Sequence, residues 1–376
     1  MSPTVLDLED QPQIFDIRQN YDGLDLKGEI VRGLGSQLPT LPSLLLWDDQ
    51  GQDLFDRFSQ TPTYYPFHGE IEVLSRYGSD IGASVPAEGA LLELGCGAVR
   101  KTKSILSGFR QQQKPVNYFA LDVSHQGLTT SLVELRKLFK DSPFITITGL
   151  LGTYDDCVAW LTGLKTMRAL GSMTILWLGN SIANLDSHDQ ASAFLARFGT
   201  ACQHARLACR FLVSTDICQR DEKVLEAYNV GRPEYRDFLL NALDAANLEL
   251  GYEAFSADDW TPASWLDERE RNLHFYLTAK YDVLVPLTSV AEGTDAVTIH
   301  KGQRVRVVTS GKWSEEVMGQ ICGKAGFHIQ QRWKDDSGDY CIFLLKNVTA
   351  NISDRRVVQP TAGVGEKILE LKKRKI

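Results

Sequence analysis

The first stretch that could do chemistry is ALLELGCGAVRKTKSIL, residues 90–106, where an apolar run ends in two glycines and continues as a basic, helix-like segment. Gly95 and Gly97 lack side chains, so the backbone there can approach a ligand closely. A pyrophosphate-binding turn needs a third glycine one helical turn later, where this chain has AVRKT with Arg100. The sequence also has no GxxxxGKS/T loop. The turn therefore predicts a small-molecule site without a phosphate cradle.

Three more residues fit the same ligand. Asp122 ends the next apolar run, where an acid can accept hydrogen bonds from both hydroxyls of a ribose. Thr153 and Tyr154 follow the third run and are placed to meet an adenine. This set suits a nucleoside cofactor, S-adenosylmethionine (SAM), and favours a methyltransferase over a nicotinamide enzyme or a silent relative. If the glycines only tightened a turn, Asp122 would be unexplained.

The elements that position these residues alternate regularly. Short apolar runs followed by helical patterns predict a parallel sheet covered on both faces, a doubly wound α/β fold. A helix and a terminal hairpin then complete the same sheet. The predicted strands are 89–97, 116–124, 144–152, 173–181 and 206–217, the helices are 99–112, 125–139, 154–164, 188–202 and 313–327, and the hairpin is 328–346.

The alternation of strand and helix patterns stops in the middle of the chain, which predicts an inserted second, substrate-binding domain. A mostly helical segment, 223–250, is followed there by tryptophan-rich and strand-like pieces. We expect a helix to begin at Glu70, after an aromatic turn. The expected cofactor-binding domain covers residues 66–220 and 311–348, and the expected substrate-binding domain covers 14–65 and 221–310.

The composition excludes several classes of partner. The 376 residues are 43% hydrophobic and 23% charged, with a net charge of -8. A sequence pI near 5.5 argues against nucleic-acid binding. No apolar stretch approaches the ~20 residues that span a bilayer, and the acidic N-terminus is unlike an export signal. The seven cysteines are scattered singly, without metal-site spacing, and are expected to be buried. We expect a cytoplasmic, monomeric protein with a small-molecule partner, no metal and no membrane contact.

Five segments together resemble the histidine-specific N-methyltransferase family. They are LPSLLLWDDQGQDLFDRFSQTPTYYPFHGEIEVL, LLELGCGAVRKTKSIL, YFALDVS, LWLGNSIANLD and SGKWS. The family is known for the trimethylation of histidine in ergothioneine biosynthesis, and its fungal members act on tryptophan and dimethylallyltryptophan. The resemblance runs from about residue 14 to 345 and implies a Rossmann-like, class I methyltransferase sheet.

The resemblance also implies roles for individual residues. The cofactor contacts would be Gly95, Lys101, Asp122, Thr153 and Tyr154, with Gly97 and Gly179 beside them. Some members carry an aspartate where Thr153 stands. Gly179, Asn184 and Tyr228 match residues that hold the amine and carboxylate of the amino acid, and Tyr64 matches a pocket tyrosine.

Two departures bear on the substrate. Trp47 stands where the histidine enzymes have a tyrosine, and Val308 replaces the glutamate of their Glu-x-Ser motif. An imidazole facing valine would leave buried nitrogens unpaired, at roughly 1–3 kcal/mol each. Ser310 matches the serine and is expected to accept an indole N–H, and Phe275 is expected to stack on a ring. An aromatic amino acid is therefore favoured, tryptophan first; Phe275 would narrow the pocket against a prenyl group.

The expected reaction is an in-line attack of a neutral amine on the sulfonium methyl group, which positioning accelerates. We assign Asn184, Tyr228 and Tyr64 to the catalytic site and identify no general base, since a lone His68 is typical of a surface. Repeated methylation is compatible with such a pocket. The alternatives are a histidine N-alpha-methyltransferase, a dimethylallyltryptophan N-methyltransferase and a catalytically silent SAM-binding protein.

Overall fold

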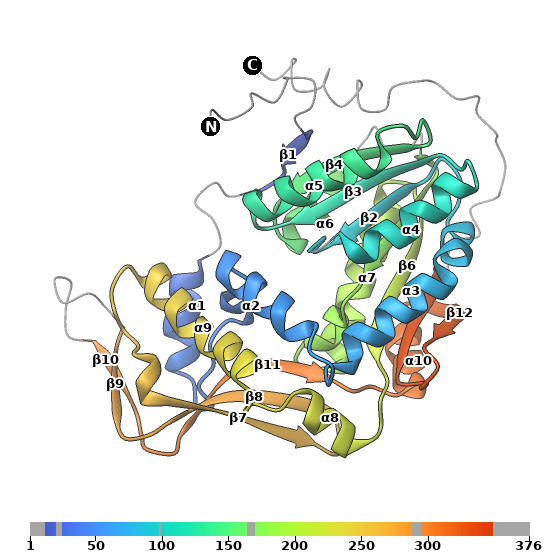
Figure 1. Cartoon of the computed structure of the whole chain (residues 1–376). Helices are drawn as coiled ribbons and strands as arrows, with labels where there is room; N and C mark the ends of the chain where they lie inside the picture. The colour runs from blue at the N-terminus through green and yellow to red at the C-terminus, as the bar shows by residue number, and fades with distance from the viewer. Residues whose placement is uncertain (1–11, 20–24, 98, 164–169, 288–294, 349–376) are drawn as a thin grey trace, which may run out of the picture.

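The computed structural model describes residues 12–19, 25–97, 99–163, 170–287 and 295–348. Its larger lobe is built on an eight-stranded sheet (Figure 1). The neighbours from β1 to β6 pair parallel, and β13 and β12 add an antiparallel edge. In spatial order the strands are β1 (Ile14–Asp16), β4 (Ile145–Leu151), β3 (Val116–Asp122), β2 (Ala90–Leu94), β5 (Ser172–Trp177), β6 (Ala208–Asp216), β13 (Tyr340–Asn347) and β12 (Phe327–Lys334).

Helices cover both faces of this sheet, because the central strands are apolar on both sides. All five residues of β2 are buried. Two adjacent residues of this strand, Leu91 and Leu92, belong to different hydrophobic cores, one on each face of the sheet. One face packs against α3 (Tyr65–Ser84), α4 (Arg100–Gln111) and α5 (His125–Phe139), and the other against α6 (Tyr154–Gly163), α7 (His188–His204) and α10 (Glu315–Lys324). The doubly wound α/β prediction is confirmed.

Two local expectations differ from the structure. The helix expected at Glu70 begins at Tyr65, because Pro66 in its first turn favours helix initiation. The three-residue strand β1 pairs with β4 in the large sheet, although the sequence placed residues 14–65 in the substrate-binding domain. A strand this short shows too little alternation to be recognised.

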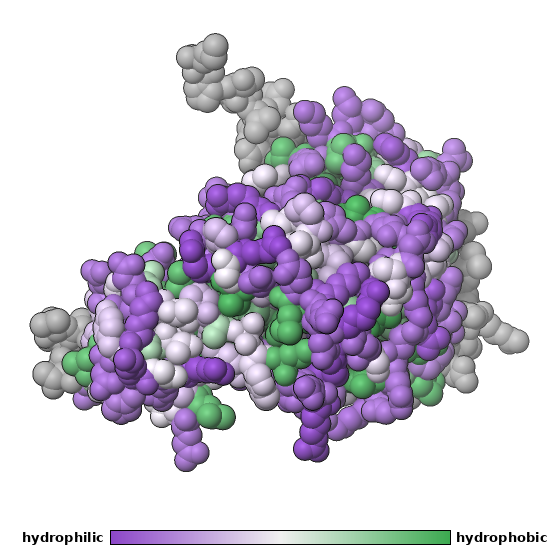
Figure 2. Space-filling view, turned by 60° about the horizontal axis from the view of Figure 1, so that its bottom comes forward, coloured by the Kyte–Doolittle hydropathy of each residue, from purple (hydrophilic) through white to green (hydrophobic). Residues whose placement is uncertain are grey.

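The second lobe joins the inserted segment to the N-terminal helices around one core. Helix α9 packs against α1, η1 and α2 and touches β7 of the small antiparallel sheet β11-β8-β7. On the face of the whole molecule shown in Figure 2, hydrophilic residues predominate. The elements are α1 (Leu26–Leu34), η1 (Ser43–Leu46), α2 (Asp49–Ser59), α8 (Asp221–Ala227), α9 (Pro233–Leu250), η4 (Ala257–Asp259), β7 (Trp260–Asp267), β8 (Asn272–Ala279), β9 (Val283–Pro286), β10 (Ala296–Ile299) and β11 (Arg304–Gly311).

The seven cysteines are free and buried, as expected. Among the helices of the described segments, none has the length and apolar character needed to cross a membrane. The two-domain division itself stays a prediction, apart from the change at β1.

Candidate active site

The glycine turn lies where the strand order reverses. The chain runs outward from β2 to β3 and β4 and then returns to β5 on the other side of β2. Ligands of open α/β sheets bind beyond the strand ends at such a point. Gly95 (φ 72°) and Gly97 (φ 43°) are both left-handed, which suits glycine. A Cβ on Gly95 would lie 3.5 Å from the Tyr154 hydroxyl, so the turn stays narrow on that side and open elsewhere.

Asp122, at the end of β3, has one carboxylate oxygen that can still accept a hydrogen bond. Its Oδ1 accepts from the Ser124 backbone N–H at 3.0 Å, while its Oδ2 meets the weak Cys96 thiol donor at 3.8 Å. Burial raises the pKa of Asp122, and backbone N–H groups of neighbouring residues oppose that rise. The second oxygen is therefore able to accept from a ribose hydroxyl.

Thr153 already has a local partner. Its backbone N–H and its hydroxyl both donate to Asp156 Oδ2, at 2.9 and 2.8 Å, and the Asp156 N–H donates back to the Thr153 hydroxyl at 3.1 Å. This reciprocal pattern caps α6 in the manner of a capping box. The hydroxyl hydrogen of Thr153 is therefore engaged inside the protein. Its neighbour Tyr154 packs edge-on against Trp177 and Phe194, and burial raises its pKa to about 12.

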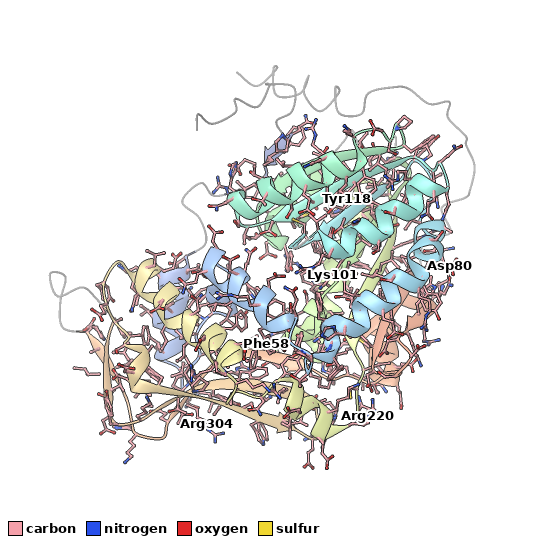
Figure 3. The ribbon with its side chains drawn as sticks, in the orientation of Figure 1. Phe58, Asp80, Lys101, Tyr118, Arg220 and Arg304 are labelled. Carbon is pink, nitrogen blue, oxygen red and sulfur yellow. The ribbon has the colours of Figure 1, made fainter. Side chains whose placement is uncertain are left out.

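Lys101 and Gly179 both contact the carboxylate of Glu70. Lys101 Nζ lies 2.6 Å from Glu70 Oε2, and the Gly179 N–H donates to Oε1 at 2.8 Å. Glu70 also accepts from the Ser214 hydroxyl and is 1% exposed. Figure 3 shows Lys101 at the end of the sheet that faces Phe58 and the second lobe. The carboxylate thus fixes the loop after β5 beside the helix that follows the glycine turn.

A cluster of buried hydroxyls surrounds an ion pair that the sequence analysis missed. The Tyr64 and Tyr228 hydroxyls lie 3.3 Å apart, and Tyr228 lies 3.5 Å from Ser310 Oγ. Lys312 Nζ donates to Tyr228 at 2.9 Å and to Ser310 at 2.8 Å, and lies 3.0 Å from Asp216 Oδ2. Lys312 and Asp216 are both fully buried. Lys312 belongs to the SGKWS segment of the family resemblance, so that segment was the available signal.

Asn180 links this cluster to β6 instead of capping the following helix, η3 (Ser181–Asn184). Its Oδ1 accepts from the Thr215 hydroxyl and the Asp216 N–H, both at 2.9 Å. Its Nδ2 donates to Ser310 Oγ at 3.2 Å. No cap hydrogen bond is formed by its side chain.

The remaining predicted residues fall into two neighbouring groups. Asn184 and Val308 line one pocket of about 220 Å³ between η3, β11 and the loop before η1. Trp47 is partly buried and packs edge-on against Phe55 and Phe238, beside the core of the second lobe. Phe275 belongs to the same core, with its ring centroid 5.7 Å from that of Tyr228. Val308 is paired with Phe275 across β11 and β8, which brings the two groups together.

No side chain at the cluster is an evident base. His68 is exposed, and its Nε2 lies 2.9 Å from the carbonyl oxygen of Thr61. Burial raises the pKa of Tyr64 and Tyr228, so both phenols are protonated near neutrality. Within the described segments, no group of three or more His, Cys, Asp and Glu side chains could hold a metal ion.

Comparison with known proteins gives one family and several relatives. The profile of a family described as "Histidine-specific methyltransferase, SAM-dependent" matches residues 26–347. The N-methyltransferase benX of Aspergillus terreus is 42% identical over 337 residues, 89% of this chain and 91% of that protein. The N-methyltransferase dtpB of Aspergillus flavus is 35% identical over 88% of this chain and 90% of its own. The 4-dimethylallyltryptophan N-methyltransferase easF of Epichloe festucae var. lolii is 27% identical over 89% and 99%.

Proposed function

The chain belongs to the family of histidine-specific, SAM-dependent methyltransferases. We propose that it is an N-methyltransferase that methylates the α-amino group of an aromatic L-amino acid, with tryptophan as the first candidate. The observation that carries the proposal is the position of Val308, which lines the same pocket as Asn184. Family resemblance assigns Asn184 to the amino-acid backbone and gives the histidine enzymes a glutamate at the Val308 position. A valine there meets the substrate side chain with an apolar surface.

The surroundings of Val308 support an aromatic ring. Its cross-strand partner Phe275 is completely buried in a core that also contains Tyr228, and Val308 and Trp47 are partly buried and pack against that core. Apolar surface gains roughly 25 cal/mol for each Å² removed from water, so the largest ring gains most. An imidazole would leave a polar nitrogen opposite Val308 without a partner, at about 1–3 kcal/mol. The name of the easF relative, a 4-dimethylallyltryptophan N-methyltransferase, supports an indole substrate class.

The residues around the glycine turn fit SAM. The turn is free of side chains at Gly95 and Gly97, and Asp122 keeps one carboxylate oxygen for a ribose hydroxyl. These residues would hold the cofactor together with Lys101, Tyr154 and Gly179, while Thr153 would contribute through its position beside Tyr154. SAM supplies an electrophilic methyl group when it is bound.

The contribution of the chain is to place the amine and to keep it neutral. We assign Asn184 and Tyr228 to the amine and carboxylate of the substrate, with Tyr64 beside them. Because Tyr64 and Tyr228 are buried phenols with raised pKa values, they act as hydrogen-bond donors instead of removing the ammonium proton. The site then selects the minor neutral form of the amine, and positioning provides most of the acceleration.

Calorimetry and mass spectrometry test this function together. The protein is titrated with L-tryptophan, L-phenylalanine, L-tyrosine and L-histidine in the presence of S-adenosylhomocysteine, and each mixture is then supplied with SAM. We expect binding and methyl-sized mass gains on the α-amino group of aromatic amino acids, with tryptophan strongest and histidine silent. A preference for histidine would overturn the proposal, and a preference for a prenylated tryptophan would replace its first candidate.

A further inference from the structure

The hydrogen-bond donors and acceptors of the buried hydroxyl cluster can be counted, because its neighbours Asn180 and Lys312 each act as donors toward it. We propose that Lys312 and Asn180 fix Ser310 as a hydrogen-bond donor, and that the cluster of Ser310, Tyr228 and Tyr64 binds the α-carboxylate of the substrate. Ser310 then does not accept an indole N–H, contrary to the expectation from the sequence. The inference rests on the proposed amino-acid substrate but not on which aromatic ring it carries.

The orientation of the Asn180 amide is determined by its surroundings. The Asp216 N–H is a donor only, and it lies 2.9 Å from the amide oxygen. The opposite end of the amide, 3.2 Å from Ser310 Oγ, must therefore be the NH2 group. One lone pair of the Ser310 hydroxyl is thus occupied by Asn180.

Lys312 occupies the other lone pair. An ammonium group has three hydrogens and no acceptor, and Nζ has three oxygen partners within 3.0 Å: Asp216, Tyr228 and Ser310. Asp216 also accepts from the Tyr65 hydroxyl at 2.6 Å and from the Cys218 N–H at 3.0 Å, contacts that favour the carboxylate. Burial lowers the pKa of Lys312 and the neighbouring Asp216 opposes that fall, while the three oxygen partners of Nζ match the three hydrogens of an ammonium group. Ser310 therefore accepts from both Lys312 and Asn180.

The three hydroxyl groups carry more hydrogens than the cluster has acceptors for them. Ser310, Tyr228 and Tyr64 carry three hydroxyl hydrogens, but only two contacts, of 3.3 and 3.5 Å, connect the three oxygens. At least one hydrogen therefore has no acceptor within the cluster. Because 3.5 Å is at the limit of a hydrogen bond, Ser310 is the hydroxyl whose hydrogen is most easily given to a ligand. A buried hydroxyl without a hydrogen-bond partner is destabilising, so the cluster is complete only with an acceptor.

The α-carboxylate is the acceptor that every amino acid provides. The amine must direct its own lone pair at the methyl group, and the indole N–H is a donor that would face another donor at Ser310. The carboxylate would also lie near the positive charge of Lys312, one hydroxyl away. Hydrogen bonds to a charged group are stronger than neutral ones. The aromatic ring then points toward Val308 and Phe275 without polar recognition of its nitrogen.

The test compares an amino acid with the amine that lacks its carboxylate. The kcat/KM values of wild type, Ser310→Ala and Lys312→Met are measured for L-tryptophan, tryptamine and 1-methyl-L-tryptophan. Each variant is expected to lose about 10- to 100-fold with L-tryptophan but less than about threefold with tryptamine, so that discrimination between the two collapses. Blocking the indole nitrogen should change kcat/KM of wild type less than about threefold. Thr200→Ala is the control and should leave all three values unchanged, because Thr200 is exposed on α7 and its hydroxyl donates to the Ala196 carbonyl of the same helix.

Several outcomes separate this inference from the proposed function. Equal losses with L-tryptophan and tryptamine would overturn it, as would a large loss with 1-methyl-L-tryptophan that Ser310→Ala abolishes. If another amino acid is the preferred substrate, that amino acid and its decarboxylated amine replace the tryptophan pair, so the carboxylate test stands when the tryptophan choice fails. A phenol-specific effect of Ser310→Ala, seen with L-tyrosine and absent with L-phenylalanine, would place the ring at Ser310 and overturn the inference. S-adenosylhomocysteine binding confirms folding of each variant, and Lys312→Met combined with Asp216→Asn provides a neutral site if Lys312→Met alone does not fold.

Discussion

Lys312 and Asp216 form an ion pair of 3.0 Å between two side chains that are both without solvent exposure. Asp216 ends β6 of the large sheet, and Lys312 directly follows β11 of the second lobe. The pair therefore joins the two lobes at the place where Tyr228 and Ser310 meet. Because buried charges are costly unless paired, this contact constrains both lobes to one arrangement.

The stability of the protein should depend on both members of this pair. Lys312→Met leaves the Asp216 carboxylate buried without its counter-ion, and we expect the free energy of unfolding to fall by about 3–5 kcal/mol. Lys312→Met combined with Asp216→Asn should recover more than half of that loss, because no charge remains buried. Urea denaturation followed by tryptophan fluorescence measures all three proteins. If the double variant is no more stable than the single one, the pair does not determine stability.

A buried acid beside the glycine turn gives the protein a defined pH dependence. Glu93 accepts from Tyr118 at 2.5 Å and from Thr102 at 2.7 Å, and burial raises its pKa from 4.5 to about 7. Between these values the folded protein holds a proton that the unfolded chain has released. The free energy of unfolding contributed by Glu93 therefore falls as the pH rises through this range.

Glu93→Gln should remove this dependence. We expect the variant to be more stable than wild type by about 1–3 kcal/mol at about pH 8, with a much smaller difference near pH 4.5. Urea denaturation at the two pH values measures it. Glu316→Gln, at an exposed position in α10, is the control. Its free energy of unfolding should differ from that of wild type by the same amount at both pH values. A pH-independent effect of Glu93→Gln would show that this carboxyl does not titrate in that range.

The local parts of this fold were predictable from the sequence, and the long-range contacts were not. Strands such as β2 and β5 are short, mostly apolar runs, and Gly95 indicates a turn by its residue type alone. The Thr153–Asp156 cap has a local signal, a Thr-x-x-Asp spacing at a helix start, which the sequence analysis did not use. The SGKWS segment contains Lys312, but the hydrogen bonds of Lys312 and Asn180 depend on partners distant in the chain, so no local pattern could specify their roles.

The conformation of Gly95 predicts a specific effect on cofactor binding. Gly95→Ala places a Cβ at a left-handed φ of 72°, which costs roughly 1–2 kcal/mol, and narrows the turn beside Tyr154. We expect the affinity for S-adenosylhomocysteine to fall at least about tenfold, measured by calorimetry. Gly319→Ala is the matched control, because a Cβ there meets open space within α10, and it should leave affinity unchanged. Unaltered binding to Gly95→Ala would mean that the turn does not hold the cofactor.

Substrate choice should follow the residue at position 308. Val308→Glu restores the carboxylate that the histidine enzymes carry there, next to the pocket that Asn184 also lines. We expect kcat/KM for L-histidine to rise about 10- to 100-fold, because the imidazole gains a charge-assisted hydrogen bond, and that for L-tryptophan to fall as an apolar contact is lost. Val308→Leu keeps the site apolar and should retain the wild-type order of substrates. Parallel changes for both amino acids in Val308→Glu would show that Val308 faces neither ring, and the aromatic preference would then have to come from Trp47 and Phe275 alone.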